Sequence, residues 1–362
     1  MPETKRMANF ELLRIIAMMM VVTMHYIYRA DLLPVLTEQV NEHQNFGLVI
    51  ESLCIVAVNV FVMISGYFMV KSPFKFRRFC RLLCQVIFYS LTIPLALSVF
   101  GLPIIAEAEG VYGFIQYILP ISTVHYWFVT AYLLLYLISP FLNAAFEKIE
   151  KKQLEKIILI LLLIFCGIKS FVPVSLNLDT FGYDFGWFIC LYLTGGYIRI
   201  YGLKILDGKK RGLFLYLISV ALIYLLKMGS YILYTKTGLL KYFYDVPFHY
   251  NFILVYLAAI GLFYAFMGIK IKEGRFAAML RGIAPLCLGV YLLHMHIDIS
   301  GKWYGWMGFL FDSLLKAGYI GMILKMLVSV LFIFVICIII DFVRYRIFTV
   351  IEKNLIDQYY AR

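Results

Sequence analysis

The amino-acid sequence predicts an all-α polytopic membrane protein with about ten transmembrane helices and both termini in the cytoplasm. Of its 362 residues, 63% are hydrophobic and only 15% are charged, whereas a soluble globular chain carries about 25% charged residues. Apolar runs long enough to cross a bilayer recur along the whole chain. The formal net charge of +12 comes largely from short loops between these runs, which is typical of membrane orientation and argues against nucleic-acid binding.

The predicted spans follow the order of the apolar runs. Residues 10–28 are expected to be a retained helix, because no small-residue cleavage site follows them as a signal peptide requires. The fifth span is short and contains Lys169. Residues 101–124 contain glycine, proline and two glutamates, which favours an external loop with a partly buried turn. In chain order, the predicted spans are 10–28, 46–70, 82–100, 125–145, 157–172, 183–201, 212–234, 249–269, 284–302 and 320–343.

The basic residues test this count. An odd number of spans would destroy the asymmetry that the positive-inside rule produces when the N-terminus is cytoplasmic. The external loops then hold Arg29, Lys236, Lys241, Lys302 and Lys316. The cytoplasmic loops and termini hold Lys71, Lys75, Arg77, Arg78 and Arg81, then Lys148, Lys151, Lys152 and Lys156, then Lys204, Lys209, Lys210 and Arg211, then Lys270, Lys272, Arg275 and Arg281, with Lys5, Arg6, Arg344, Arg346, Lys353 and Arg362 at the ends.

One membrane domain is expected over residues 1–362, with no soluble domain and no internal repeat. The seven cysteines show neither a CxxC pair nor a Cys/His metal spacing, so neither a disulfide framework nor a metal site is predicted. No GxSxG, Walker A, HExxH or Rossmann glycine pattern occurs in a usable context.

Three ionisable residues lie within the first apolar run, NFELLRIIAMMMVVTMHY (9–26). Ionisable side chains inside a span are costly and are therefore candidates for function. Glu11 and Arg14 are i,i+3 neighbours that can pair near the cytoplasmic end. His25 lies eleven residues beyond Arg14, which on a helix is ~16 Å of rise and ~20° of rotation, so the two share a face. The alternative is an interfacial anchor, in which Glu11 and Arg14 snorkel and His25 marks the outer boundary.

Other polar groups in the spans have a packing interpretation beside a functional one. Asn59, Ser65 and Gly66 in NVFVMISGYFMV (59–70) are typical of close helix contacts. The next stretch, KSPFKFRRFCRLL (71–83), is a stop-transfer charge cluster, but cations at a helix mouth also suit a phosphate-rich cytosolic ligand.

Histidines accompany two of the later spans. His125, Tyr126 and Trp127 open the fourth span, where aromatic residues typically form an interfacial belt. His294 and His296 in YLLHMHIDIS (291–300) are both expected within the ninth helix. At i,i+2 they would point about 200° apart, so paired metal ligation by them is not predicted.

Taken in order, these motifs resemble the membrane-bound acyltransferase 3 family. The series comprises ELLRIIAMMMVVTMH, NVFVMISGYFM, RFCR (78–81), WFVTAYLLLYLISPFLN and YLLH. Bacterial members of this family O-acetylate surface polysaccharides, lipopolysaccharide, peptidoglycan and other cell-envelope glycans. The resemblance covers nearly the whole chain. It implies a multi-pass enzyme of the bacterial cytoplasmic membrane that moves an acyl group from cytosolic acyl-CoA, most simply acetyl-CoA, to a glycan hydroxyl outside.

The resemblance also implies roles for individual residues. The catalytic set comprises His25, Arg14 and Glu11. The donor set, which would bind acyl-CoA, comprises Arg78 and Arg81 of the Arg-x-x-Arg motif, with Ser65 and Tyr67 of the Ser-Gly-aromatic signature. The acceptor set comprises Asn59, His125, Trp127 and His294.

Two positions depart from the family pattern. Glu11 occupies the usual Asp position of Glu-Leu-Asp-Gly-Leu-Arg, and Asn59 stands where members often carry Asp. Many members also have an extra helix and an external hydrolase-like domain. This chain ends after the tenth predicted span, so the acceptor glycan is expected to meet the membrane domain itself, a second copy or a partner enzyme.

Several functional alternatives remain open from the sequence. His25 is suited to act as a general base on the acceptor hydroxyl or as a nucleophile that carries the acyl group. A transporter or flippase for a glycan precursor would also contain buried polar groups, and Gly195, Gly196 and Pro285 would mark its broken helices. A signalling protein without activity is a third interpretation, against which the intact Arg14 and His25 argue.

Overall fold

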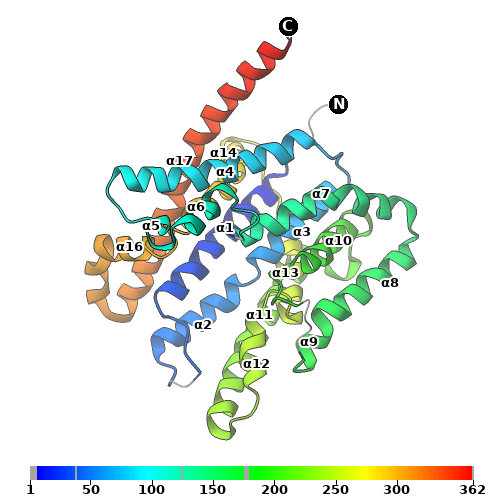
Figure 1. The fold of residues 1–362 in the computed structure, drawn as a ribbon. Coiled ribbons are helices and arrows are strands. Elements are labelled where there is room, and N and C mark those ends of the chain that lie inside the picture. The colour runs from blue at the N-terminus through cyan, green and yellow to red at the C-terminus, as the bar shows by residue number, and fades with distance from the viewer. Residues whose placement is uncertain (1–5, 37–38, 124, 175–178, 361–362) are drawn as a thin grey trace.

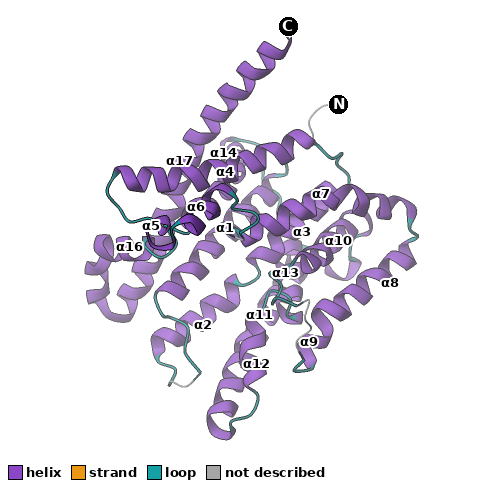
Figure 2. Ribbon diagram, in the orientation of Figure 1, coloured by secondary structure: helices purple, strands orange, loops and turns teal. Residues whose placement is uncertain are grey.

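The computed structural model describes residues 6–36, 39–123, 125–174 and 179–360. All regular structure in these ranges is helical, and no strand occurs in them (Figures 1 and 2). The predicted all-α polytopic fold is confirmed, since eight helical segments are long and apolar enough to cross a membrane. These segments are Ala8–Arg29, Glu42–Met69, Phe76–Val99, Trp127–Lys148, Lys209–Thr237, Lys241–Met267, Arg275–His294 and Gly318–Asn354.

The helices follow one another with short connections. In chain order they are α1 (Ala8–Arg29), α2 (Glu42–Cys54), α3 (Ala57–Met69), α4 (Phe76–Val99), α5 (Ile105–Glu109), α6 (Val111–Ile118), α7 (Trp127–Lys148), α8 (Lys151–Leu162), η1 (Leu163–Gly167), α9 (Ile168–Phe171), α10 (Phe185–Tyr201), η2 (Lys204–Leu206), α11 (Lys209–Thr237), α12 (Lys241–Asp245), η3 (Val246–Phe248), α13 (Ile253–Met267), α14 (Arg275–Ile283), η4 (Ala284–Leu286), α15 (Cys287–His294), α16 (Trp303–Phe311), η5 (Asp312–Ala317) and α17 (Gly318–Tyr360).

Two of the ten predicted spans are not among the eight segments. The fifth corresponds to the continuous helical run α8–η1–α9, whose middle is a π-helical turn. The sixth corresponds to α10, which is 17 residues long. Both are observed as helices. The α8–η1–α9 run contains no stretch of 18 residues as poor in charge as those of the eight segments, and α10 is shorter than any of them.

Local sequence signals begin two of these helices. At the start of α2, the Asn41 side chain accepts a hydrogen bond from the Gln44 backbone N–H, and the Gln44 side chain accepts one from the Asn41 backbone N–H. This reciprocal pair is a capping box. At the start of α10, the Asp184 carboxylate accepts a hydrogen bond of 2.7 Å from the Trp187 backbone N–H. Both caps fix helices that pack near the candidate site.

Helix α1 lies inside the bundle, where it contacts α2, α3, α13, α14, α15 and α17. It begins at the end of the bundle from which α17 projects, so the two ends of the chain lie on the same side (Figure 1). A chain that crosses the membrane an even number of times has both of its ends on the same side. Which side faces the cytoplasm remains a prediction from the basic residues.

Glycines allow α3 and α10 to pack backbone against backbone. A Cβ atom at Gly66 would lie 2.2 Å from the carbonyl oxygen of Tyr192, and one at Gly195 would lie 2.2 Å from that of Met63. Only glycine fits at such a contact, which is a recurrent device in membrane helices. Gly195 and Gly196 therefore lie inside a continuous helix, and the expectation that they break it is wrong.

Two helix limits and one predicted loop differ from the expectations. The ninth span was expected to continue to residue 302, but α15 ends at His294 and a turn follows. The last helix, α17, continues well beyond residue 343 to Tyr360. Residues 101–124 contain two short helices, α5 and α6, and Tyr117 of α6 is buried as the predicted turn requires. Pro285 lies in a 3-10 turn, η4, that joins α14 to α15.

Candidate functional site

The centre of the candidate site is a histidine pair contributed by α1 and α15. His25 lies near the end of α1, and His294 is the last residue of α15. His25 Nδ1 lies 3.0 Å from His294 Nε2. His294 is buried, whereas His25 keeps part of its surface accessible. The fold thus brings together two residues that the sequence analysis assigned to different sets.

The hydrogen bonds around His294 assign the protons of the neutral pair. His294 Nδ1 lies 2.6 Å from the carbonyl oxygen of Val290. Because a carbonyl oxygen can only accept, Nδ1 of His294 carries a proton and donates it. In a neutral ring Nε2 then has the lone pair, and His25 Nδ1 donates to it. His25 Nε2 is left as the basic nitrogen, and no described residue forms a hydrogen bond with it.

The end of α15 is held by aromatic residues from other helices. The Tyr126 hydroxyl, just before α7, donates a hydrogen bond of 2.9 Å to the carbonyl oxygen of Leu292. The Trp303 ring of α16 lies 6.4 Å from the His294 ring. Both aromatic side chains are buried. They restrict the position of His294 and, through it, the orientation of His25.

Glu11 and Arg14 form the predicted ion pair on α1. Arg14 Nη1 donates to Glu11 Oε1 at 2.5 Å, and the Glu11 side chain is 2% exposed. The guanidinium also lies 5.5 Å from the Phe68 ring centre. No other described residue accepts a hydrogen bond from Arg14. A guanidinium has five N–H donors, so the ion pair fixes Arg14 and still leaves donors for a ligand.

Arg78 and Arg81 lie exposed on the first turns of α4, but they have different contacts. Arg81 Nη2 donates to Glu352 of α17 at 2.5 Å, and Arg77 Nε donates to the other oxygen of the same carboxylate at 2.9 Å. The Arg78 guanidinium lies 5.3 Å from the Tyr136 ring centre on α7. The cluster is at the end of the bundle from which α17 projects.

Ser65 and Tyr67 lie in the packed interface around α3. The Ser65 hydroxyl donates to the carbonyl oxygen of Phe61 at 3.1 Å, as serines in helices commonly do. The Tyr67 hydroxyl accepts a hydrogen bond of 3.1 Å from Arg199 Nη1. The Tyr67 ring lies 5.1 Å from that of Phe10 on α1. The Ser-Gly-aromatic signature therefore supports the beginning of α1, close to Glu11 and Arg14.

Asn59 links three segments of the fold. Its amide nitrogen donates to the carbonyl oxygen of Tyr250 at 2.7 Å, and its amide oxygen accepts from Trp187 Nε1 at 3.0 Å. The side chain is fully buried. A neutral amide supplies the donor and the acceptor that this position uses, whereas a carboxylate would supply acceptors only. The replacement of the family's frequent aspartate fits these contacts.

His125 and Trp127 flank Tyr126 but contact different groups. His125 Nε2 accepts a hydrogen bond of 3.1 Å from the Ile297 backbone N–H. Burial lowers the pKa of His125 to about 4, so this ring is neutral near pH 7. Trp127 packs against Tyr183 and Tyr250, with ring centres 4.5 and 5.9 Å away.

His296 lies in a separate polar cluster that the sequence analysis did not recognise. The Asp298 carboxylate accepts hydrogen bonds from the Tyr117 hydroxyl at 2.8 Å and from the Ile105 backbone N–H at 2.6 Å. His296 Nδ1 accepts from the Asp298 backbone N–H at 3.2 Å. His294 and His296 are expected to point in different directions because both would lie on one helix. That reason is wrong, because α15 ends at His294 and His296 lies in the turn that follows.

A buried carboxylate in the last span was also missed. Asp341 of α17 accepts hydrogen bonds from Gln85, Tyr89 and Arg344, all within 3.1 Å. The only signal in the sequence is that Asp341 lies within a predicted span. An aspartate near the end of a span is often an interfacial residue, so its position alone does not indicate this network. Among the described residues, no group of three or more His, Cys, Asp or Glu side chains could hold a metal ion.

The chain matches a known protein-family model. The acyltransferase 3 model, described as an acyltransferase domain, matches residues 7–342, which is nearly the whole chain. No curated protein and no solved structure matches the chain significantly.

Proposed function

Because the chain belongs to the acyltransferase 3 family, we propose that it transfers an acetyl group from cytosolic acetyl-CoA to a hydroxyl of a cell-envelope glycan. The enzyme would act as a multi-pass protein of the bacterial cytoplasmic membrane. The observation that carries this proposal is the 3.0 Å contact between His25 Nδ1 and His294 Nε2. It leaves His25 Nε2 as a free basic nitrogen on the helix that also carries Arg14.

As a general base, His25 would accept the proton of the acceptor hydroxyl at Nε2. The hydroxyl oxygen attacks the thioester carbonyl, the carbon–sulfur bond breaks, and the proton passes to the leaving thiolate. The ester and free CoA are the products. The positive charge that His25 gains is shared with His294, whose Nε2 accepts the Nδ1–H bond.

As a nucleophile, the same Nε2 would attack the thioester directly. CoA would leave as its thiolate, and the acyl-imidazolium would then pass the acetyl group to the acceptor hydroxyl. The hydroxyl proton would go to the thiolate, and His25 would return to its neutral form. Both routes need a neutral His25 with its proton on Nδ1. The histidine pair supports both equally, so a trapped acetyl-histidine is what separates them.

The residues at the other end of α1 suit the donor. Arg14 is oriented by Glu11 and would bind the polar groups of the pantetheine arm or stabilise the developing oxyanion. Arg78 and Arg81 are exposed cations that suit the nucleotide phosphates of CoA. Arg14 and His25 are separated by ~16 Å of helix, which gives α1 the length to join a cytosolic donor to an outer acceptor.

The test is acetyl transfer by the purified protein in proteoliposomes. The acceptor is the cell's own envelope glycan, de-O-acetylated with mild base, and the donor is radiolabelled acetyl-CoA. His25→Ala should lower kcat by about a hundredfold or more, since a lost general base costs about that. His43→Ala, which removes an exposed histidine on α2, should leave transfer unchanged.

Two results would contradict the proposal. Unchanged transfer in His25→Ala would remove His25 from the chemistry. Movement of a lipid-linked sugar across the bilayer without any consumption of acetyl-CoA would identify a flippase instead.

A further inference from the structure

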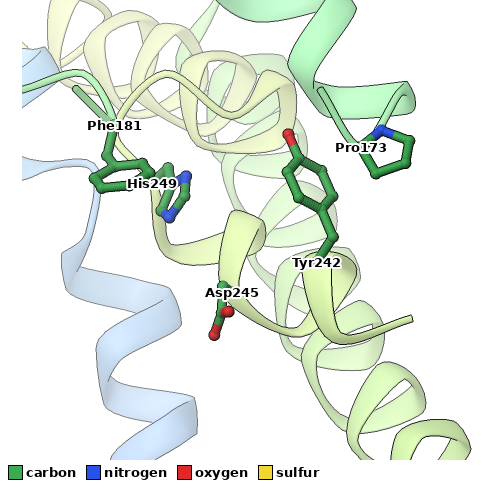
Figure 3. A pocket seen from close by; sticks show the side chains of 5 residues that line it. All are labelled: Pro173, Phe181, Tyr242, Asp245 and His249. Atoms are coloured by element: carbon green, nitrogen blue, oxygen red, sulfur yellow. The ribbon is translucent and has the colours of Figure 1, made fainter. Parts of the chain in front are cut away.

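We infer that a cavity at the end of the bundle opposite Arg78 and Arg81 is a binding subsite for a neutral sugar unit of the acceptor. The cavity measures about 490 Å³ and is lined by Pro173, Phe181, Tyr242, Asp245 and His249. It lies beside α9 and α12, away from the projecting end of α17 (Figures 1 and 3). This volume is in the range of small-ligand pockets. The inference rests on the proposed function, because it assigns the cavity to the acceptor of that reaction.

The walls of the cavity suit the face of a sugar ring. Figure 3 shows Phe181 and His249 on one side and Tyr242 and Pro173 on the other, with Asp245 on α12 between them. Aromatic faces carry partial negative charge and attract the polarised C–H groups of a pyranose. Apolar walls with a few polar groups are typical of ligand sites.

Two polar groups of the cavity form no hydrogen bond with the described part of the chain. His249 Nδ1 is buried and forms no hydrogen bond with a described residue. The Asp245 carboxylate is exposed and also receives no hydrogen bond within the described part of the chain. Buried polar groups are almost always paired, so an unpaired one calls for an explanation. Sugar hydroxyls both donate and accept, and can therefore satisfy a neutral imidazole and a carboxylate together.

The charges around the cavity favour a neutral ligand over an anionic one. The lining residues include one carboxylate and no lysine or arginine. The nearby Lys169 ammonium, 5.2 Å from the Phe181 ring centre, is already paired with Asp179 at 2.5 Å. The Lys227 ammonium, which interacts electrostatically with Asp245, already donates a hydrogen bond of 2.6 Å to the carbonyl oxygen of Tyr244. Both lysines are therefore engaged within the protein, and a phosphate would be repelled by the Asp245 carboxylate.

The aromatic walls are held in place before any ligand binds. Phe181 has a left-handed backbone with φ of 62°, which is unusual for a bulky residue. Its N–H donates to Asp179 Oδ1 at 2.9 Å, and its carbonyl oxygen accepts from Tyr250 N at 3.0 Å. The Tyr242 hydroxyl donates to the carbonyl oxygen of Lys169 at 2.7 Å. Such local strain persists where surrounding contacts fix it, and it is often found at binding sites.

A series of ring contacts runs from Tyr250, which neighbours the cavity residue His249 in the chain, to the histidine pair. Tyr250 follows His249 in the chain, and its ring lies 5.9 Å from that of Trp127. The series continues through Phe128 at 5.9 Å, Tyr291 at 5.7 Å and His294 at 6.3 Å. These packed rings separate the cavity from His25, so a sugar unit held in the cavity lies away from the reacting hydroxyl. The subsite should therefore act on acceptor affinity and not on the chemical step.

The experiment compares His249→Ala and Asp245→Ala with wild type in the proteoliposome assay. With the de-O-acetylated envelope glycan as acceptor, each variant should raise the KM about fivefold to tenfold, which is the effect of one lost hydrogen bond with its desolvation cost. The kcat and the KM for acetyl-CoA should not change. Acid-released monosaccharides of the same glycan should show no difference between the proteins. Phe171→Ala is the matched control, because this exposed side chain of α9 lies near the cavity without lining it.

A second pair of variants separates a contact from a loss of structure. Tyr242→Phe keeps the ring but loses the bond to Lys169, and it should raise the KM less than Tyr242→Ala does. Equal KM values for wild type and all lining variants would overturn the inference. An equal rise in the Phe171→Ala control, or a fall in kcat with unchanged KM, would also overturn it.

Direct binding separates this inference from the proposed function. Binding of the glycan to His25→Ala protein is measured by thermophoresis, with and without the cavity substitutions. If the wild type transfers no acetyl group but His249→Ala and Asp245→Ala still weaken binding, the subsite stands and the proposed function fails. If choline displaces the glycan or binds in its place, the carboxylate and rings form a cation site, and the inference is overturned.

Discussion

At the scale of single residues, the chemistry depends on which ring nitrogen of His25 is free to accept a proton. His294 Nδ1 is committed to the carbonyl oxygen of Val290, so its Nε2 must accept the proton of His25 Nδ1. In the proposed reaction, His294 would be a positioning residue that acts through His25. A histidine in this position does for His25 what the carboxylate does for the histidine of a serine protease.

Replacing His294 tests this role. His294→Ala should lower kcat about tenfold or more, because His25 loses the acceptor that fixes its tautomer. His294→Gln places an amide that can accept the same proton, and should recover part of that loss. Steady-state transfer kinetics measure both, and the KM for acetyl-CoA should stay at the wild-type value. Equal kcat losses in the two variants, or a change in KM alone, would contradict the positioning role.

The buried histidines outside the spans predict a pH dependence of stability. Burial lowers the pKa of His125 to about 4, and it holds the pKa of His296 well below its usual range. The unfolded chain, with ordinary histidine pKa values near 6.5, then binds protons more tightly than the folded one. The stability contributed by the neutral rings is fully present above about pH 6.5, and it is lost progressively as the pH falls toward 4.

Thermal unfolding in detergent between pH 7.5 and 5 measures this effect. The unfolding temperature should fall with pH, and His125→Gln should make the fall shallower because one of the buried neutral histidines is removed. His43→Gln, which alters an exposed histidine, should keep the wild-type slope. The same slope in His125→Gln would contradict the assignment.

For the site residues, the sequence predicts those relations that lie within one helix. Glu11, Arg14 and His25 lie on one continuous helix, so spacing alone placed them on one face. The contact between His25 and His294 joins residues 269 positions apart. This contact depends on how α1 and α15 pack against each other. The periodicity of a single sequence does not predict which helices pack together.

At the scale of elements, α17 is joined to the basic first turns of α4 by hydrogen bonds. Glu352 accepts hydrogen bonds from Arg77 and Arg81, and it lies on the part of α17 that extends beyond the predicted span. The carboxylate competes with any phosphate for these guanidinium groups. Exposed ion pairs of this kind contribute at most about 1 kcal/mol, so the competition is expected to be mild.

Glu352→Gln should release both arginines. The KM for acetyl-CoA should fall about twofold to fivefold, which corresponds to an exposed pair of that strength. The difference from wild type should shrink at high salt because the charges are screened. Lys353→Gln, at the exposed neighbouring position, serves as the control. An unchanged or higher KM in Glu352→Gln would argue against Arg81 as a donor-binding residue.

The contact between α3 and α10 predicts a stability effect. At Gly66 or Gly195, an added Cβ would overlap a backbone carbonyl of the opposite helix. The helices would have to separate, and overpacking of this kind costs about 1–3 kcal/mol. Gly66→Ala and Gly195→Ala should each lower the unfolding temperature and the yield of folded protein. Gly229→Ala on α11 meets nothing within 4 Å and should be neutral or stabilising, so equal losses in all three variants would contradict this packing.

The existence of the helices was predictable from the sequence, but several of their limits were not. Apolar runs and the need to satisfy backbone groups in lipid dictate helices of about bilayer length. The end of α15 at His294 and the short helices α5 and α6 depend on tertiary contacts, such as those of Tyr126 with Leu292 and Tyr117 with Asp298. The glycines of α10 were interpreted as breaks because close packing and helix breaking use the same residue.

At the scale of the whole molecule, the fold separates two chemistries along the bundle. One end holds the arginines of α4 and the start of α1, and the other holds the aromatic cavity beside α12. His25 lies near the far end of α1, three turns beyond Arg14. This arrangement supports transfer from a donor on one side of the membrane to an acceptor on the other. The basic residues predict that the donor side is cytoplasmic.

The most direct test of this account places the two substrates on opposite sides of one membrane. De-O-acetylated envelope glycan is sealed inside proteoliposomes, and radiolabelled acetyl-CoA is added outside. We expect the wild-type protein to label the enclosed glycan and His25→Ala to leave it unlabelled. Equal labelling by His25→Ala, or acetylation only when donor and acceptor share one side, would contradict transmembrane transfer through His25.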